Sequence, residues 1–187
     1  MARARPISGL AADTEFAVAA ARIVAVRAAE VAEHSRDVLD VSDIERVHDM
    51  RVATRRLRAA LEVFEACFPK KPHRAALREV KALADALGER RDRDVTIALF
   101  ENLGTAMPTP DRAGVASLVE QLRAEQAAAN EDLVPFVTDE RLAELDERLA
   151  ELVGAAEGGV GGASAERTDG GSAGRSGGAG ATEGNGA

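Results

Sequence analysis

Apolar residues recur every three to four positions along most of the chain, and short polar or proline-containing breaks separate these stretches. This spacing is typical of amphipathic α-helices. It predicts five helices, over residues 13–39, 43–68, 72–103, 111–134 and 138–153. No alternating pattern typical of a strand extends beyond a few residues. We therefore predict an all-α fold, a bundle of four to five antiparallel helices.

Helix boundaries are predicted from capping and helix-breaking residues. Ser42 followed by Glu45 forms a capping box at the start of the second helix. Thr138 begins the last helix. Gly88 breaks or weakens the third helix, and Pro135 ends or kinks the fourth.

Composition divides the chain into three parts. Residues 1–12 are predicted to be a flexible arm, and residues 13–153 a helical domain. Residues 154–187 contain thirteen of the seventeen glycines. Such a segment cannot bury enough apolar surface to offset its loss of conformational entropy, so we predict a disordered Gly-rich tail.

The residue types restrict the core and the location of the protein. The chain has no Trp or Tyr and five Phe, so the core is predicted to consist mainly of Ala, Leu and Val. A lack of aromatic residues also argues against single-strand binding by base stacking. The lone Cys67 is predicted to be a core thiol. No apolar run approaches the roughly 20 residues of a membrane span, and the N-terminus does not resemble a signal peptide, so we expect a cytoplasmic protein.

Charge is unevenly distributed along the chain. The net charge is −8, yet residues 46–93 contain thirteen Lys or Arg against seven Asp or Glu, a net charge of +6. An acidic protein is a poor general nucleic-acid binder. A concentrated basic segment is nevertheless suited to a compact, highly charged anion.

The second predicted helix has two distinct faces. Four residues fall within about 80° of one another on a helical wheel: His48, Arg51, Arg55 and Arg58. Arg56 points elsewhere. The apolar residues form a separate face beside the cationic one: Met50, Leu57, Leu61, Phe64 and Phe68.

This cationic stripe has two interpretations. Aligned cations repel one another unless an anion lies across them, and arginine is suited to bidentate phosphate contacts. Alternatively, the stripe is a solvated face with ion pairs four residues apart. Little acid interleaves the stripe, although Glu62 at its far end is placed to pair with Arg58. The pattern therefore favours an anion-binding face.

A second basic segment follows Pro69. Its residues are Lys70, Lys71, Arg74, Arg78 and Lys81, and three of them share one helix face within roughly 60°. Asp92 and Asp94 lie among arginines and are predicted to be ion-pair partners. Arg91 is predicted to bind phosphate, or else to be structural and join one helix to the next.

Catalytic and metal-binding motifs were not found. His34 and His73 are isolated, which favours surface or capping roles. No histidine stands at a metal-ligand spacing from His48, and no nucleophile–base set or Walker-type glycine loop occurs. We expect no enzyme activity, no cofactor and no metal.

Two motifs in order resemble the CHAD family, the conserved histidine α-helical domain. The first is His-x-x-Arg-Val-x-x-Arg-Arg-Leu-Arg over residues 48–58. The second is Leu-Gly-x-x-Arg-Asp-x-Asp-Val over residues 87–95. The resemblance covers residues 13–153. It implies an all-helical fold whose basic surface binds inorganic polyphosphate, in association with polyphosphate granules.

The chain resembles only the N-terminal half of this family. Full members have a second helical half with its own His/Arg-rich helix, whereas no His-x-x-Arg run follows Val95 here. We expect a homodimer to cover the surface that the second half would cover.

The sequence therefore predicts a non-catalytic polyphosphate-binding module. Its predicted binding residues are His48, Arg51, Arg55, Arg56, Arg58, Arg74, Arg78, Lys81 and Arg91. One alternative is a phosphohydrolase acting on polyphosphate or nucleotides. Another is a structural bundle that binds an acidic protein partner. Nucleic-acid binding ranks below these.

Overall fold

The computed structural model describes residues 3–165, with side chains to residue 158. This part of the chain contains five α-helices, one short 3-10 helix and no strand. Their bounds are α1 Phe16–His34, α2 Ile44–Val63, η1 Glu65–Cys67, α3 Lys70–Ala106, α4 Thr109–Val137 and α5 Asp139–Ala165. The predicted all-α fold is confirmed.

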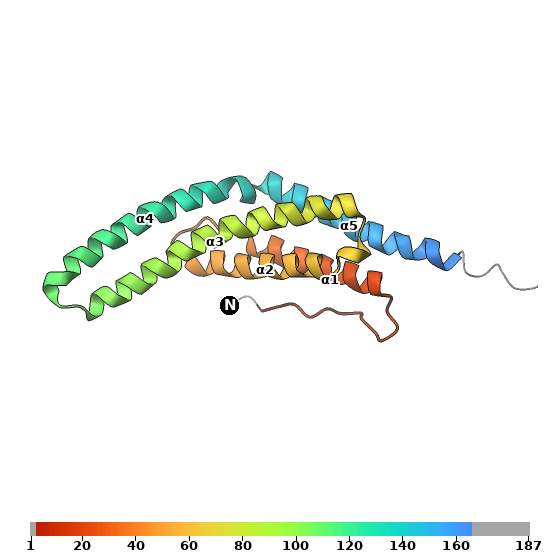
Figure 1. The fold of residues 1–187 in the computed structure, drawn as a ribbon, viewed down its shortest axis with the longest axis horizontal. Helices are drawn as coiled ribbons and strands as arrows, with labels where there is room; N and C mark the ends of the chain where they lie inside the picture. Colours follow the sequence, from red (N-terminus) through yellow and green to blue (C-terminus); the bar gives the residue numbers. More distant parts are fainter. Residues whose placement is uncertain (1–2, 166–187) are drawn as a thin grey trace, which may run out of the picture.

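The helices form an elongated bundle (Figure 1). α1 packs against α2 and α5, α2 packs against α3, and α3 packs against α4 along their length. α3 and α4 are long antiparallel helices that arch over the shorter α1 and α2, and their connecting turn projects beyond the other helices (Figure 1). α2 and α3 are also antiparallel, which places the basic stripe of α2 beside α3.

The core is built mainly from small and branched aliphatic side chains, as the composition predicts. Met50, Leu57 and Leu61 of α2 are fully buried, and Phe68 is nearly so. These residues belong to the predicted apolar face of α2. They pack with Ala20, Ala21 and Val24 of α1, Leu83 and Leu87 of α3, and Leu149 and Leu152 of α5.

Two predicted breaks are absent from the described helices. α3 continues through Gly88 without interruption, and α4 continues through Pro135 to Val137. The turn between α3 and α4 is correspondingly shorter than expected. At Gly88, packing of α3 against α2 and α4 outweighs a local cost of about 1 kcal/mol for glycine in a helix, so the predicted break is wrong. Pro135 lies in the last turn of α4, so the predicted end of that helix is wrong by three residues.

The start of α2 is capped one residue later than predicted. The Asp43 side chain accepts a hydrogen bond from the backbone N–H of Glu45 at 3.1 Å. Ser42 instead donates its hydroxyl to Asp40 at 2.7 Å. At the start of α5, Thr138 accepts from the backbone N–H of Arg141 at 3.3 Å, as expected.

The two ends of the chain differ from the predicted division into a flexible arm, a helical domain and a disordered tail. α5 continues to Ala165, twelve residues past the predicted end of the last helix. The remainder of the predicted Gly-rich tail lies outside the described residues. The N-terminal segment has no helix before Phe16 but lies against α1: the Arg5 backbone N–H donates to Glu30, and Arg22 donates to the Gly9 carbonyl.

Candidate functional site

A groove between α2 and α3 brings part of the predicted stripe together. Its volume is about 330 Å³. One wall is formed by Arg51, Arg55 and Arg58 of α2, and the other by Ala84, Asp85, Gly88, Glu89 and Asp92 of α3. Gly88 lies beside the Arg51 side chain, and a Cβ at this position would meet Arg51 Nε at 3.9 Å, an ordinary contact distance.

Two of the three groove arginines are not neutralised. Arg51 is half-buried and Arg55 is exposed. Neither makes an ion pair or a hydrogen bond through its side chain to any residue described between 3 and 158. Their guanidinium groups therefore keep their donors available for an anion, as the stripe predicts.

The third groove arginine belongs to a small ion-pair network. Arg58 Nε lies 3.1 Å from Glu62 Oε1, and Lys81 Nζ lies 3.1 Å from the same oxygen. Hydrogen bonds from Lys81 and then Arg58 hold the pKa of the Glu62 carboxyl below its usual value. The predicted Arg58–Glu62 pair is confirmed, and the network connects the groove to Lys81 on α3.

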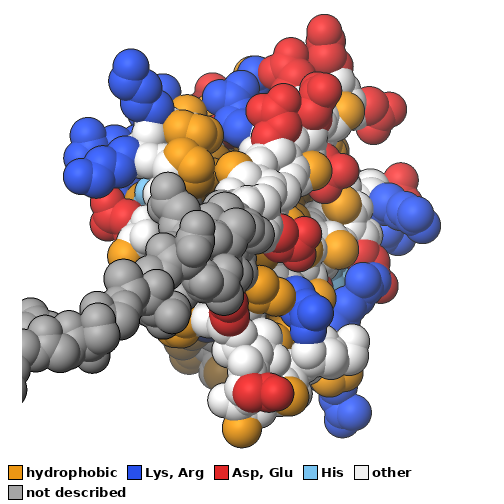
Figure 2. Space-filling model, turned by 90° about the vertical axis from the view of Figure 1, so that its right-hand side faces the viewer, with side chains coloured by type: hydrophobic (Ala, Val, Ile, Leu, Met, Phe, Trp, Pro, Cys, Tyr) orange, Lys and Arg blue, Asp and Glu red, His pale blue; other side chains and the backbone are white. Residues whose placement is uncertain are grey.

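Beyond Lys81 the basic surface continues along α3. Arg74 and Arg78 are exposed and lie on the same helix face as Lys81. Neither makes an ion pair with any residue in the described range. Figure 2 views the end of the molecule where α3 begins; there, groups of Lys and Arg side chains project away from a group of Asp and Glu, so the two signs of charge are not evenly mixed.

Three predicted binding residues lie neither in the groove nor on the basic face of α3 that carries Arg74, Arg78 and Lys81. The His48 ring lies one turn before the groove, with the carboxylates of Glu45 and Asp49. Arg56 is half-buried on another side of α2 and is already engaged in a contact. Arg91 Nη1 donates to the Ile44 carbonyl oxygen at 2.9 Å, which supports the structural alternative for this residue.

Ligand atoms of Glu45, His48 and Asp49 lie within 4.8 Å of one another. The sequence interpretation did not recognise this group, although positions i, i+3 and i+4 on a helix share one face. Exposed acidic groups of this kind are common without an ion, so the absence of a metal site stays a prediction.

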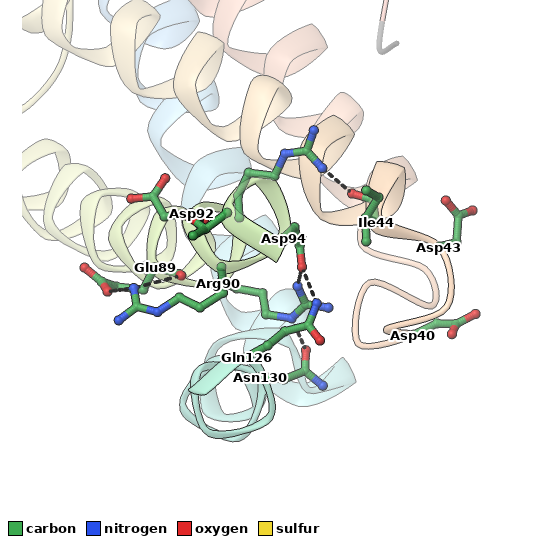
Figure 3. A network of polar contacts seen from close by, with 12 residues as sticks. Asp40, Asp43, Ile44, Glu89, Arg90, Asp92, Asp94, Gln126 and Asn130 are labelled. Carbon is green, nitrogen blue, oxygen red and sulfur yellow. Dashed lines mark hydrogen bonds and ion pairs between the residues drawn. The ribbon is translucent and has the colours of Figure 1, made fainter. Parts of the chain in front are cut away.

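A buried polar network lies on the side of α3 that faces α4, away from the groove (Figure 3). Arg90 and Asp94 form an ion pair with both side chains fully buried. Gln126 Nε2 donates to Asp94 Oδ1 at 2.7 Å, and Arg90 Nε donates to Asn130 Oδ1 at 3.2 Å. Asn130 Nδ2 then donates to the Leu39 carbonyl at 3.1 Å. The network joins α3 to α4 and to the α1–α2 loop.

Arg90 and Asp94 have a structural role that the sequence revealed only in part. Asp94 was expected to pair with an arginine, and it does. Burial lowers the pKa of the Arg90 guanidinium, with a further contribution from the charge of Arg91. The prediction for Asp92 was wrong: this residue is exposed and lines the groove without an ion pair to any described residue.

Two other predicted roles can be compared with the structure. His73 is fully buried rather than exposed: its ring stacks on Phe68 with centroids 5.9 Å apart, and Nε2 lies 2.9 Å from the Leu61 carbonyl oxygen. Cys67 is partly buried at the edge of the core, and burial raises the pKa of its thiol. A raised thiol pKa disfavours the reactive thiolate.

The family model of the CHAD domain matches residues 22–175, which is most of the chain. The chain therefore belongs to the CHAD domain family, as its two motifs indicated. The matched range starts and ends later than the predicted residues 13–153. No curated protein sequence matches the chain. None of the described helices is both long and apolar enough to cross a membrane.

Proposed function

We propose that the chain binds inorganic polyphosphate without hydrolysing it. The observation that carries this proposal is the pair of guanidinium groups, Arg51 and Arg55, that line a groove of a CHAD domain protein without an ion pair to any described residue. The bound anion extends from this groove past Arg58 to Lys81 and along the exposed face of α3. His48, Arg56 and Arg91 are not part of the binding surface in this proposal.

The chemistry of the groove suits a repeating phosphate. Each phosphate along the chain offers an anionic oxygen to a guanidinium or ammonium group. A charge-assisted contact contributes about 1.5–3 kcal/mol, and solvent screening reduces it at exposed positions. Several contacts along a stripe therefore give useful affinity for a long chain and little for orthophosphate.

Direct titration tests this function. Purified protein is titrated with long-chain polyphosphate and with orthophosphate, at two salt concentrations. We expect long polyphosphate to bind, with affinity that falls steeply as salt rises, because bound counterions are released as they are from nucleic acid. Absent binding, or affinity that does not change with salt, would contradict the proposal.

The same protein tests the phosphohydrolase alternative. Such an enzyme needs a bound divalent metal, and Glu45, His48 and Asp49 are the group that could hold one. These side chains lie one turn before the groove. We expect no phosphate release from polyphosphate or nucleotides with added magnesium or manganese. Release that a chelator abolishes would establish the enzyme instead.

The alternative of an acidic protein partner is tested by competition between that partner and polyphosphate. A partner that uses the same arginines would be displaced by polyphosphate, whereas a partner bound elsewhere would not.

Under the polyphosphate proposal the chain is cytoplasmic and collects on polyphosphate granules. Colocalisation of a tagged chain with stained granules, lost in cells that lack polyphosphate, is the expected result.

We further propose that the chain pairs with a second copy of itself. α3 extends beyond the first residue of α2, and there Val95, Leu99 and Leu103 are 52%, 62% and 45% exposed. These residues are spaced four apart and form one apolar stripe on the projecting part of α3. A two-fold interface would bury the stripe against its own copy.

A further inference from the structure

The second wall of the groove is acidic. Asp85, Glu89 and Asp92 of α3 lie across from the three arginines of α2, so the formal charges of the lining cancel. Among the described residues, no ion pair joins the two walls. Glu89 pairs instead with Arg93 on its own helix, at 2.5 Å. Asp85 and Asp92 have no ion pair with any residue described between 3 and 158.

The acidic wall continues the same face of α3 that carries the basic residues. Because α3 is one helix, Arg74, Arg78 and Lys81 lie within about 80° of Asp85, Glu89 and Asp92 on a helical wheel. The sign of the charge changes between Lys81 and Asp85. The surface is therefore basic at the end nearest Lys81 and neutral in sum within the groove.

We propose that Asp85 and Asp92 are specificity-determining residues that exclude short phosphate anions from the groove. This inference rests on the proposed function and concerns the same site. The groove is the place where three guanidinium groups converge on one small volume, so it would otherwise hold a short phosphate. The two carboxylates oppose such an anion at close range.

A long polyphosphate offsets this opposition with contacts outside the groove. Part of it contacts Arg51 and Arg55, and the rest lies over Arg58 and Lys81 and continues past Arg78 and Arg74, where the helix surface is open and basic. At that end Glu62 is neutralised by Arg58 and Lys81 together. A short anion at the basic end meets cations spaced about one helical turn apart, so it gains few contacts at once.

The exclusion can be measured with tripolyphosphate. Asp85→Asn together with Asp92→Asn removes two charges and keeps side-chain size. We expect this double variant to bind tripolyphosphate about tenfold more tightly than the unmodified protein at low salt. Adding Arg55→Ala to the double variant should remove most of the gain, because the gain arises in the groove. The titrations are made with a chelator present.

A matched control separates this effect from net charge. Asp146 and Glu157 line a different groove, between α1 and α5. Asp146→Asn with Glu157→Gln removes the same number of negative charges at this second site. We expect no gain in tripolyphosphate affinity from this control. An equal gain in both double variants, or no gain in either, would overturn the proposal.

Two further arms distinguish the remaining outcomes. In the first, magnesium replaces the chelator. If the double variant then binds tripolyphosphate more weakly than the unmodified protein does, Asp85 and Asp92 attract a cation–phosphate complex, and exclusion is overturned. Long polyphosphate is titrated in parallel with the unmodified protein. Failure of that titration would overturn the proposed function, while the tripolyphosphate result still decides the role of Asp85 and Asp92.

Discussion

The role of each arginine depends on the acid that reaches it. Arg90 is buried against Asp94, and its neighbour Arg91 reaches across to the Ile44 carbonyl, so both hold helices together. Arg51 and Arg55 lie on the opposite side of the α2–α3 contact and have no such partner among the described residues. Arginines in one sequence segment thus divide into a group that holds helices together and a group that we propose binds phosphate.

Charge reversal at Arg51 and Arg55 should abolish polyphosphate binding and leave the fold intact. Neither guanidinium holds the helices together, so Arg51→Glu with Arg55→Glu replaces two positive charges with two negative ones without loss of core packing. Filter binding and circular dichroism measure the two effects. Arg3→Glu with Arg36→Glu changes the net charge equally at exposed positions outside the groove. Unfolding of the Arg51/Arg55 variant, or equal loss of binding in the control, would contradict this prediction.

The buried pair of Arg90 and Asp94 should contribute far more to stability than an exposed pair on the same helix. Asp94→Ala leaves the Arg90 charge buried without its partner, which costs about 3–5 kcal/mol. Glu89→Ala breaks the exposed Arg93–Glu89 pair, also spaced four residues apart, and should cost about 0.5 kcal/mol or less. Urea unfolding of the two variants provides the measurement. Similar costs for both would show that burial does not determine the role of this pair.

At the scale of the helix, α3 determines the geometry of the site. It packs on α2 over part of its length and on α4 over the part that leads to its C-terminal end. Its 37 residues extend over about 55 Å. A break at Gly88 would have separated the acidic wall of the groove from the basic residues before it. The uninterrupted helix instead keeps all of these residues on one face.

Gly88→Ala should stabilise the protein by about 0.5–1 kcal/mol. Glycine loses more backbone entropy in a helix than alanine, and the added Cβ would meet Arg51 Nε at 3.9 Å, an ordinary contact distance. Gly9→Ala is the contrasting variant. Gly9 has a φ of +75°, and its Cβ would lie 3.0 Å from Arg22 Nη1, so substitution there should destabilise. Thermal unfolding provides the measurement, and a midpoint temperature that changes in the same direction for both variants would refute this account.

Helical periodicity and the two motifs were enough to predict the helices and the α2 stripe, because both depend on local spacing. The apolar face through Met50 and Leu57 is buried as predicted. The acidic wall depends on which helix packs beside α2 and in which direction. Nothing in the spacing of Asp85 and Asp92 reveals that they lie across from Arg51 and Arg55. Likewise, His73 looks isolated in the sequence because its partners, Phe68 and the Leu61 carbonyl, are brought to it by the turn at η1.

At the scale of the whole molecule, charge and apolar surface are separated along α3. The exposed face of this helix is basic from Arg74 to Lys81 and acidic from Asp85 to Asp92. It then becomes apolar at Val95, Leu99 and Leu103, where it extends beyond α2. A dimer through the apolar part would place the two polyphosphate-binding surfaces outside the interface, so pairing would double the binding surface without covering it.

Leu99→Glu should convert the proposed dimer into a folded monomer. Leu99 lies in the middle of the apolar stripe and is 62% exposed, so a charge there disturbs an interface and not the core. Val63→Glu provides the control, since Val63 is 70% exposed at the end of α2, away from the stripe. Light scattering at micromolar concentration should give a dimer for the unmodified and Val63→Glu proteins and a monomer for Leu99→Glu, with unchanged helicity in all three.

Because each copy has its own groove, the monomeric variant should still bind polyphosphate, with lower avidity for chains long enough to reach both copies. An unmodified protein that is monomeric at this concentration would refute the dimer and leave the binding site of the single chain unaffected.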